Sequence, residues 1–559
     1  MRKLFLLLLI VLSACQSNNE IRYKVSSIQK NDKPALNISM EFKANPSGET
    51  VLIFQDSGWG EENLYNTLSD LRSDQASEII HEKDSHRIVI KHGKDIDQIQ
   101  FSYILQQDTE GNLTTRDTYR PVIQKEFFHV FSHNFFMLPR DYVPNSHEPF
   151  DVSIDWIDFP DDYSFVNSFD TNNRQQKIKS TDESHFHSAV FTGGDYRPYI
   201  LDIDGNKAVF GIRGDWQVFN DSMIVGVLEK TLKVQRDFWQ DHSQPYFAVT
   251  MTPTYRENGY GFQGSGLTNS FATTATNNQY LNPKGLIYLF NHELQHNWTG
   301  HTIKNENEEE QYWFSEGFTE YYTLKNIAKN KIGDLDESYF IQELNSNIQA
   351  LYKSEVKEAP NSKINYNNFW SSFEYSKLPY RRGAIFAFYL DYKIRKDSKG
   401  EKSLDDLMLA IKDDAINKNQ RLNHEYFITK ANEFLKDDIR PFFDKHIING
   451  HLYDLSSMFK EFDFEFNPTS KGYGLGFSFT EDQKFIAQID EESNAYIAGL
   501  RKGDRITLRK YAEDHTYEAE FTVLKGKKET TYKFYPAIDI DIPSLKDTNQ
   551  NKKTLSFSS

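Results

Sequence analysis

Residues 291–300, NHELQHNWTG, place two histidines four positions apart, with a glutamate directly after the first. In an α-helix, residues i and i+4 lie one above the other on the same face. His292 and His296 can therefore present two imidazoles to one cation. Glu293 lies about 100° round the helix, where it can serve as a base beside the cation without being a ligand. The spacing predicts a metal-binding helix.

No other histidine pair in the chain carries the same pattern. Four His-Glu pairs occur, but only the one at His292 has a second histidine at the fourth position after it. His129 and His133 share the spacing, but they lack the glutamate and lie in a strand-rich region, where this spacing does not align side chains. His185 and His187 could align on a strand, but no carboxylate pattern accompanies them. We interpret these four as ordinary core or surface histidines.

A third ligand is expected downstream of the two histidines. A catalytic zinc ion takes three protein ligands and keeps one position open. Glu316 in WFSEGFTEYY follows His296 by twenty residues, enough for a loop and a returning helix. We predict it as the third ligand of one Zn²⁺ per chain. Glu309 and Glu310 are alternative ligands in a charged run predicted to be a solvated loop. Glu320, one turn after Glu316, is a further alternative ligand, but it is better placed to accept a hydrogen bond from a histidine N–H.

Composition excludes several classes of protein. The chain has 559 residues, which predicts about three domains. Hydrophobic residues make up 38% and aromatic residues 14%, enough for packed cores, so wholesale disorder is excluded. The formal net charge of −17 argues against nucleic acid as a partner, because binding phosphates needs clustered Lys and Arg.

The N-terminal residues predict an export signal. MRKLFLLLLIVLSACQS has two cations, an apolar run too short for a permanent membrane helix, and small residues before Cys15. Residues 1–15 are predicted as a lipoprotein signal peptide, because LSAC is similar to the bacterial lipobox. Cys15, the only cysteine in the sequence, would carry the lipid, with 16–20 as a tether to the membrane. Gln16 is compatible with sorting to the outer membrane. As a lipoprotein, the protein is expected in the bacterial cell envelope. The alternative is an ordinary secretory signal, and either signal would place the mature protein outside the cytoplasm.

Hydrophobic patterning divides the rest of the chain. Short runs of alternating apolar and polar residues predict an antiparallel β-domain over 21–199. Apolar residues at three- and four-residue spacing predict a mostly helical domain over 200–460, with some β-rich segments interleaved. The β pattern returns over 465–535, and 536–559 is expected to be a loose polar tail. The sequence therefore predicts a multidomain α+β protein.

HELQHNW followed by WFSEGFTEYY resembles the gluzincin metallopeptidases, and within them the glycyl aminopeptidase family. KVQRDFWQDHSQPYFAVTM and PYRRGAIFAFYLDYKIR extend this resemblance over most of residues 220–535. Members of the family pair an N-terminal β-domain with a thermolysin-like catalytic domain and a C-terminal PDZ domain. The resemblance implies the same three domains here.

The resemblance also implies roles for individual residues. His292, His296 and Glu316 would bind zinc, and Glu293 would be the general base. Tyr380, in PYRRG, matches the tyrosine that donates a hydrogen bond to the oxyanion in this family. The implied activity is hydrolysis of peptide bonds, with an aminopeptidase-like specificity.

The substrate segment departs from the family pattern. GYGFQGSGLTNSFAT, residues 259–273, is similar to the strand that pairs with the substrate backbone, which implies that Gly264, Gly266, Leu267 and Thr268 bind substrate. The family usually has Gly-Leu-Glu-His, and its glutamate pairs with the substrate α-ammonium group. Thr268 is uncharged and cannot replace that contact. An endopeptidase, an aminopeptidase with another amine partner, and a catalytically silent PDZ-containing binding lipoprotein stay open as alternatives.

The β-rich C-terminal part resembles a PDZ domain. Gly474, Leu475, Gly476 and Phe477 are similar to its carboxylate-binding loop, and the later SNAYIAGLRKGDRI matches its helix and turn. Loop amides of this kind can cradle the C-terminal carboxylate of a peptide ligand. The alternative is that this module only packs on the catalytic domain.

Overall fold

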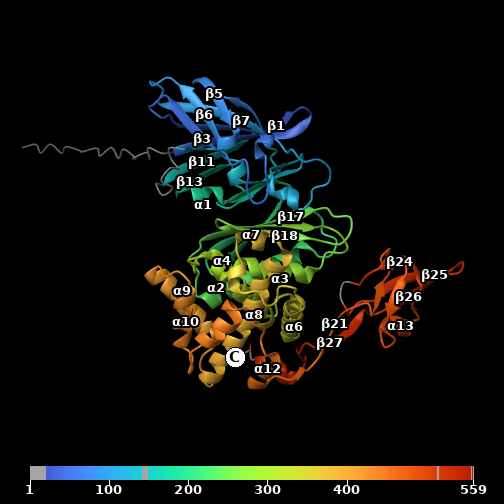
Figure 1. Cartoon of the computed structure of the whole chain (residues 1–559). Helices are drawn as coiled ribbons and strands as arrows, with labels where there is room; N and C mark the ends of the chain where they lie inside the picture. The colour runs from blue at the N-terminus through green and yellow to red at the C-terminus, as the bar shows by residue number, and fades with distance from the viewer. Residues whose placement is uncertain (1–19, 141–148, 513–514, 556, 558–559) are drawn as a thin grey trace, which may run out of the picture. The chain divides into compact units, whose positions relative to one another are not determined.

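The computed structural model describes residues 20–140, 149–512, 515–555 and 557 (Figure 1). These residues form two compact units, of which the first ends at Leu294 and the second begins at Gln295. The predicted signal peptide, Cys15 and the tether up to residue 19 lie outside the described residues. Glu20, predicted as the last tether residue, instead begins a strand. Within the described ranges, no helix has the length and apolar character needed to cross a membrane.

The first unit begins with a six-stranded sheet, in the order β13-β11-β1-β2-β7-β4. The strands are β1 (Glu20–Lys30), β2 (Lys33–Lys43), β4 (Leu68–Arg72), β7 (Gln98–Leu105), β11 (Phe150–Ile157) and β13 (Gln175–Thr181). The sheet is mixed and not antiparallel as predicted, because β1 and β11 pair in parallel. A hairpin forces neighbours such as β1 and β2 to run antiparallel, whereas β11 reaches the sheet through a long connection and can run in either direction.

Two further sheets complete the β-region, with the orders β10-β3-β6-β5 and β12-β14-β9-β8. The strands of the first are β3 (Glu49–Ile53), β5 (Ala76–Glu82), β6 (Arg87–His92) and β10 (Leu138–Pro139). Those of the second are β8 (Val122–Ile123), β9 (Phe127–Phe131), β12 (Ser164–Asn167) and β14 (Val190–Gly194). The predicted β-domain is therefore present as several packed sheets.

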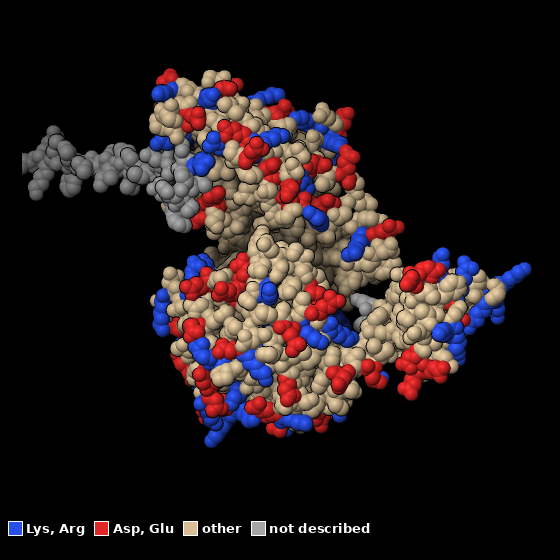
Figure 2. Space-filling view, in the orientation of Figure 1, with Lys and Arg blue, Asp and Glu red and all other residues tan. Residues whose placement is uncertain are grey.

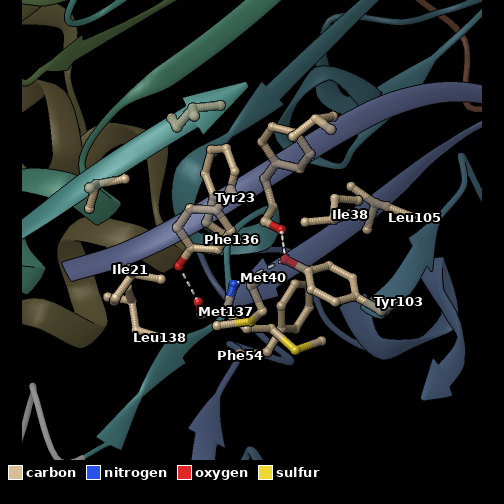
Figure 3. Packing of buried hydrophobic residues seen from close by; sticks show 14 of the residues in the cluster. Ile21, Tyr23, Ile38, Met40, Phe54, Tyr103, Leu105, Phe136, Met137 and Leu138 are labelled. Carbon is tan, nitrogen blue, oxygen red and sulfur yellow. Dashed lines mark hydrogen bonds between the residues drawn. The ribbon is translucent and has the colours of Figure 1, made fainter. Parts of the chain in front are cut away.

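Two buried tyrosine hydroxyls in the core of the β-region form hydrogen bonds with backbone groups (Figure 3). The buried Tyr103 donates to the carbonyl of Phe135 at 2.8 Å and accepts from the N–H of Met137 at 3.2 Å. Tyr23, also buried, donates to the Met137 carbonyl. Because an unpaired buried polar group costs about 1–3 kcal/mol, these bonds fix how the segment around residues 135–137 enters the core.

A five-stranded mixed sheet follows, in the order β15-β16-β17-β19-β18. Its strands are β15 (Arg197–Ile203), β16 (Asn206–Ile212), β17 (Tyr246–Thr254), β18 (Phe262–Leu267) and β19 (Ser270–Thr276). α2 (Asp221–Trp239) connects the parallel pair β16 and β17. The boundary predicted between 199 and 200 falls inside β15. The predicted substrate segment forms the β18–β19 hairpin, with β18 at the sheet edge, and α3 (Pro283–Gln295) comes next.

The second unit contains the helices that follow α3 in the mostly helical region predicted over 200–460. They are α4 (Glu308–Ser315), α5 (Gly317–Asn330), α6 (Glu337–Lys353), α7 (Tyr366–Ser371), α8 (Phe373–Asp397), α9 (Leu404–Lys418), α10 (His424–Asn432), α11 (Arg440–Phe443) and α12 (Leu455–Glu461). An N-terminal β-region followed by a helical region is therefore the architecture of this chain. On the face shown in Figure 2, acidic and basic side chains are interspersed and form no large basic patch.

The C-terminal part is β-rich and has a small core of its own. Its central strands are β22 (Phe477–Phe479), β23 (Ile486–Ile489), β24 (Arg505–Lys510), β25 (Ala519–Lys525) and β26 (Lys528–Phe534), with the short helix α13 (Asn494–Ala498). Apolar side chains from these strands and from α13, including Ile486, Ala495 and Phe521, are buried together.

The segment after residue 536 differs from the predicted loose tail. It forms β27 (Ala537–Ile540), β28 (Ser544–Leu545) and α14 (Asn549–Leu555), and these strands pair with β21 (Ser470–Tyr473) and β20 (Phe466–Asn467). The prediction was wrong because it weighed the polar composition and not the few apolar residues. Leu555 and Phe557 are buried, and Asn345 of α6 exchanges two 2.9 Å hydrogen bonds with the Leu545 backbone.

Candidate metal centre

The structure brings together the three residues predicted as ligands. His292, His296 and Glu316 each offer one ligand atom, and these atoms all lie within 4.8 Å of one another. His292 is buried in the last turns of α3, and His296 comes directly after the helix end. Two imidazoles and one carboxylate are a donor set of catalytic zinc sites, and three ligands leave a fourth position for substrate or water. The cluster therefore fits a zinc ion.

His296 is oriented by a backbone carbonyl. Its Nδ1 lies 2.9 Å from the carbonyl oxygen of Thr299, and its Nε2 lies 3.6 Å from Oε2 of Glu316. An N–H at Nδ1 donated to Thr299 leaves Nε2 as the atom that can bind a metal. A sequence carries no signal for this contact, because the partner is a main-chain atom of the turn after α3.

Glu316 lies at a break between two helices and not inside one helix. It ends α4 and precedes α5, which begins at Gly317. A Cβ added to Gly317 would collide with the backbone of Gly383 in α8, and a Cβ added to Gly383 would collide with the carbonyl of Trp313. Helices α5 and α8 therefore meet backbone to backbone, next to Glu316 and three residues after Tyr380.

Tyr380 and Glu316 line one cavity of about 400 Å³ in the second unit. Its other lining residues are mainly aromatic or hydroxylic, namely Tyr312, Phe369, Trp370, Ser371, Ser372, Phe373, Ser376 and Lys377. The Lys377 ammonium lies 4.4 Å from the centre of the Tyr380 ring, a cation–π contact. Burial, followed by the charges of neighbouring carboxylates that include Glu316, raises the pKa of Tyr312 to about 12. The cavity wall is therefore neutral at Tyr312 and offers a phenol at Tyr380.

The predicted base approaches the edge strand of the first unit. A Cβ added to Gly264 of β18 would lie 3.3 Å from Cγ of Glu293 and would overlap the ring of Phe271. Only glycine fits there, so its presence lets β18 run close to the helix that carries Glu293. Gly266 is exposed and has open space where a side chain would be, whereas Leu267 is buried.

Comparison with known proteins bears directly on this cluster. Residues 267–446, which include all three ligand positions and Tyr380, match the Peptidase family M1 domain. The match supports the M1 gluzincin peptidases as the family of this region. An M1 domain implies a hydrolase of the metallopeptidase type, which the donor set independently fits.

One solved structure extends the likeness of fold beyond the M1 domain. An aminopeptidase N family protein from Idiomarina loihiensis superposes with a TM-score of 0.68 at 15% identity, covering 96% of this chain and 100% of its own. Yeast LTA4 hydrolase in complex with bestatin gives a TM-score of 0.43 at 14% identity, covering 78% and 68%. Aminopeptidase A from Legionella pneumophila, in complex with aspartic acid, gives 0.43 at 11% identity, covering 94% and 58%. The first shows that the fold is shared along nearly the whole chain.

Thr268, which stands where the glycyl aminopeptidase pattern has a glutamate, is engaged by the protein itself. Its hydroxyl donates to the carbonyl of His185 and its N–H to the carbonyl of Ser188, both at 2.7 Å. The side chain therefore joins the β18–β19 turn to the β-region. Its hydroxyl hydrogen is already used, and the residue brings no charge to the M1 domain.

Glu320 is buried on α5 and accepts a hydrogen bond from Nδ2 of Asn347 at 2.8 Å. Asn347, on α6, is a partner that sequence reasoning did not identify. The role of Glu320 toward a ligand histidine stays a prediction. Glu309 and Glu310, the alternative ligands, lie in the first turn of α4 and not in the loop predicted for them.

Of the four histidines interpreted as ordinary core or surface residues, three are buried and His185 is exposed. His129, His133 and His187 are buried, and burial lowers the pKa of each to about 4, so that all three are neutral near pH 7. His185 and His187 lie in the short helix α1 (Glu183–His187) and not on a strand. Among the described residues, none of them belongs to a cluster with metal-ligand geometry.

The predicted PDZ loop lies between β21 and β22. The N–H of Gly474 donates to the carbonyl of Pro536 at 2.8 Å. Gly476 has φ +73°, and a Cβ there would collide with Ser493 at the start of α13. The backbone conformation and contacts within the module therefore explain why glycine occupies both positions, without reference to a ligand. Leu475 and Phe477 pack against the core of the module.

A buried network of charged side chains joins two helices, α5 and α8, near the candidate metal centre. Asp391 of α8 accepts hydrogen bonds from the Tyr321 hydroxyl at 2.6 Å and from Lys325 at 2.8 Å, both on α5. It also accepts from Arg395 and from the N–H of Leu404, each at 3.0 Å. Burial alone would raise the pKa of Asp391, but Lys325 and Arg395 outweigh it and hold that pKa well below its usual range. The network fixes α5, which follows Glu316, against α8, which carries Tyr380.

We expect Asp391→Asn to lower the free energy of unfolding by about 3 kcal/mol at pH 7, because Arg395 loses its buried carboxylate partner and Lys325 keeps only the partly exposed Asp405. A depressed folded pKa stabilises the protein above the unfolded value of about 4, and this stabilisation is lost as the pH falls. The difference between wild type and variant should therefore be about 1 kcal/mol smaller at pH 3 than at pH 7 in denaturant titrations. Asp413→Asn on α9, where the side chain is 66% exposed, is the control. Equal stability of Asp391→Asn and wild type at pH 7 would contradict this account.

Proposed function

We propose that this protein is a zinc-dependent peptidase that hydrolyses peptides outside the cytoplasm, with an aminopeptidase-like specificity. The observation that carries the proposal is the convergence of His292, His296 and Glu316 within 4.8 Å, with Glu293 next to the first ligand. The match to the Peptidase family M1 domain supports it independently.

The residues divide the chemistry among them. When bound, zinc would supply a Lewis acid that polarises a carbonyl and lowers the pKa of a coordinated water. The Glu293 carboxylate would accept the proton of the attacking water and return it to the leaving amine. The Tyr380 hydroxyl would donate a hydrogen bond to the oxygen that becomes negative as the peptide carbon turns tetrahedral. The Thr299 carbonyl would hold His296 in its ligand orientation.

The edge of β18 suits an extended substrate. An edge strand offers unpaired backbone groups to an added strand, and the glycines at 264 and 266 remove side chains that would keep it away. A peptide paired there would run past Glu293. Specificity for a free amino terminus needs a negative or strongly polar partner for the α-ammonium group, and Thr268 supplies no charge.

We expect free peptides to be cleaved one residue at a time from the amino terminus, and N-acetylated forms of the same peptides to resist cleavage. Mass spectrometry of the products over time distinguishes the possibilities. Equal cleavage of free and acetylated peptides would show that the protein is an endopeptidase and not an aminopeptidase.

Metal removal by a chelator should abolish either activity, and added Zn²⁺ should restore it at one ion per chain.

Thr268 also motivates a second candidate, a catalytically silent binding lipoprotein built on a peptidase fold. Binding of one zinc per chain, without cleavage of any peptide in a mixed digest, would favour this candidate.

For both candidate functions we propose that Cys15 anchors the protein to a membrane of the envelope and that the module over 465–535 binds the C-terminus of a peptide. Cys15→Ala should release the protein into the soluble fraction after export.

A further inference from the structure

A tight turn in the β-region holds a tryptophan in an unfavourable backbone conformation. Gly58 and Glu61 exchange two 3.0 Å backbone hydrogen bonds, which leaves Trp59 and Gly60 as the two central residues. Their φ angles are 53° and 81°, as in a type I′ turn. The first central position of such turns is normally Asn, Asp or Gly, and a bulky residue with positive φ is an outlier. Strain of this kind persists mainly where function requires the residue.

The turn and its tryptophan are firmly held although the ring is open to solvent. Arg116 donates to the carbonyl of Gly60 at 3.2 Å and to Glu61 at 2.9 Å. The Trp59 ring lies 4.6 Å from the rings of both Phe131 and His133, centre to centre, yet 45% of the residue is exposed. Burying its own apolar surface therefore does not explain why tryptophan occupies this position.

Tyr119 links Trp59 to β18, the strand proposed to pair with the substrate. The Trp59 ring meets Tyr119 edge to face, with centres 5.8 Å apart. Tyr119 packs against a buried cluster that contains Phe131 and Leu267. Leu267 is on β18, two residues after Ser265 and on the same face of the strand. Successive side chains of a strand point to opposite faces, so Ser265 points away from the face on which Gly264 meets Glu293. A peptide paired with β18 would send every second side chain to the Ser265 face, where Tyr119 and Trp59 lie.

We propose that Trp59 is the wall of a subsite that binds an apolar or aromatic side chain of the peptide substrate, on the Ser265 face of β18. The inference rests on the proposed peptidase function and assigns part of its specificity. A rigid aromatic ring with one face exposed binds an apolar side chain at little cost in conformational entropy. The strained turn and its hydrogen bonds to Arg116 hold this ring in one position, which a flexible loop would not do.

The variant that tests the proposal is Trp59→Asn, because asparagine suits the turn and removes only the ring. Peptides that differ at one position, Phe or Leu against Ala, are compared in kcat/KM. We expect the preference for Phe or Leu to fall about tenfold in Trp59→Asn, mostly through KM, and to persist in Trp59→Phe. Ile200→Ala, 54% exposed on β15, should leave the preference unchanged. An unchanged preference in Trp59→Asn, or an equal loss on every peptide, would overturn the proposal.

Failure of the peptidase function itself gives a different result. If the wild type cleaves none of the peptides, their affinities for the full-length protein and for Trp59→Asn are measured by calorimetry. Tighter binding of the Phe peptide than of the Ala peptide, lost in Trp59→Asn, would support the subsite without hydrolysis. Equal affinities in both proteins would refute it.

Discussion

Glu293→Gln is expected to reduce kcat for peptide hydrolysis by at least about a thousandfold, while zinc content and fold stay unchanged. Loss of a positioned general base costs about 10²–10⁴ in rate, and here the same group would also return the proton to the leaving amine. Glutamine has nearly the same shape, so it preserves the packing beside Gly264, but its amide cannot accept the proton. Zinc should remain because the ligands are His292, His296 and Glu316.

Three measurements check this prediction: kcat on a susceptible peptide, zinc per chain by elemental analysis, and the thermal unfolding midpoint. Glu310→Gln is the matched control, because Glu310 is an exposed glutamate in the first turn of α4. It should leave all three quantities unchanged. Activity of Glu293→Gln within tenfold of wild type, with zinc bound, would rule out Glu293 as the base.

Gly383→Ala should disrupt the close contact between α8 and α5. The added Cβ would overlap the Trp313 carbonyl and the Gly317 backbone, and a backbone cannot move aside as a flexible side chain can. Helices α5 and α8 would have to separate, and Glu316 and Tyr380 would separate with them. We expect a loss of about 3 kcal/mol in the free energy of unfolding. In the molecules that stay folded, we expect a loss of about a hundredfold in kcat/KM, because misplacing a reacting group by about 1 Å can have that effect.

Denaturant unfolding and steady-state kinetics measure the two effects separately. Gly226→Ala in α2 is the matched control: it adds the same methyl group in a helix, where a Cβ would meet nothing within 4 Å. That change should raise stability by about 0.5–1 kcal/mol, because alanine favours helix more than glycine does. Wild-type stability and kinetics in Gly383→Ala would show that the two helices are not held in contact by their glycines.

The amino-acid sequence alone predicts the parts of the site that depend on local geometry. His292, Glu293 and His296 are neighbours on one turn of chain, so helical periodicity alone predicts that the histidines converge. The spacing after His296 predicts Glu316 as a ligand, whereas Tyr380 is predicted only because its motif resembles a known family. Alternating and helical apolar patterns likewise predicted a β-region followed by a helical region, because these patterns record which face of each element is buried.

Features that depend on contacts between distant segments are visible only in the folded protein. The parallel pairing of β1 with β11, the Thr299 carbonyl on His296, and the folded segment after residue 536 have no local sequence signal. The Gly317–Gly383 contact and the Trp59–Tyr119 pair join residues more than fifty positions apart. Local patterns specify which elements form and which face is apolar, but the partner that covers a face, or accepts a hydrogen bond, is chosen only when the chain packs.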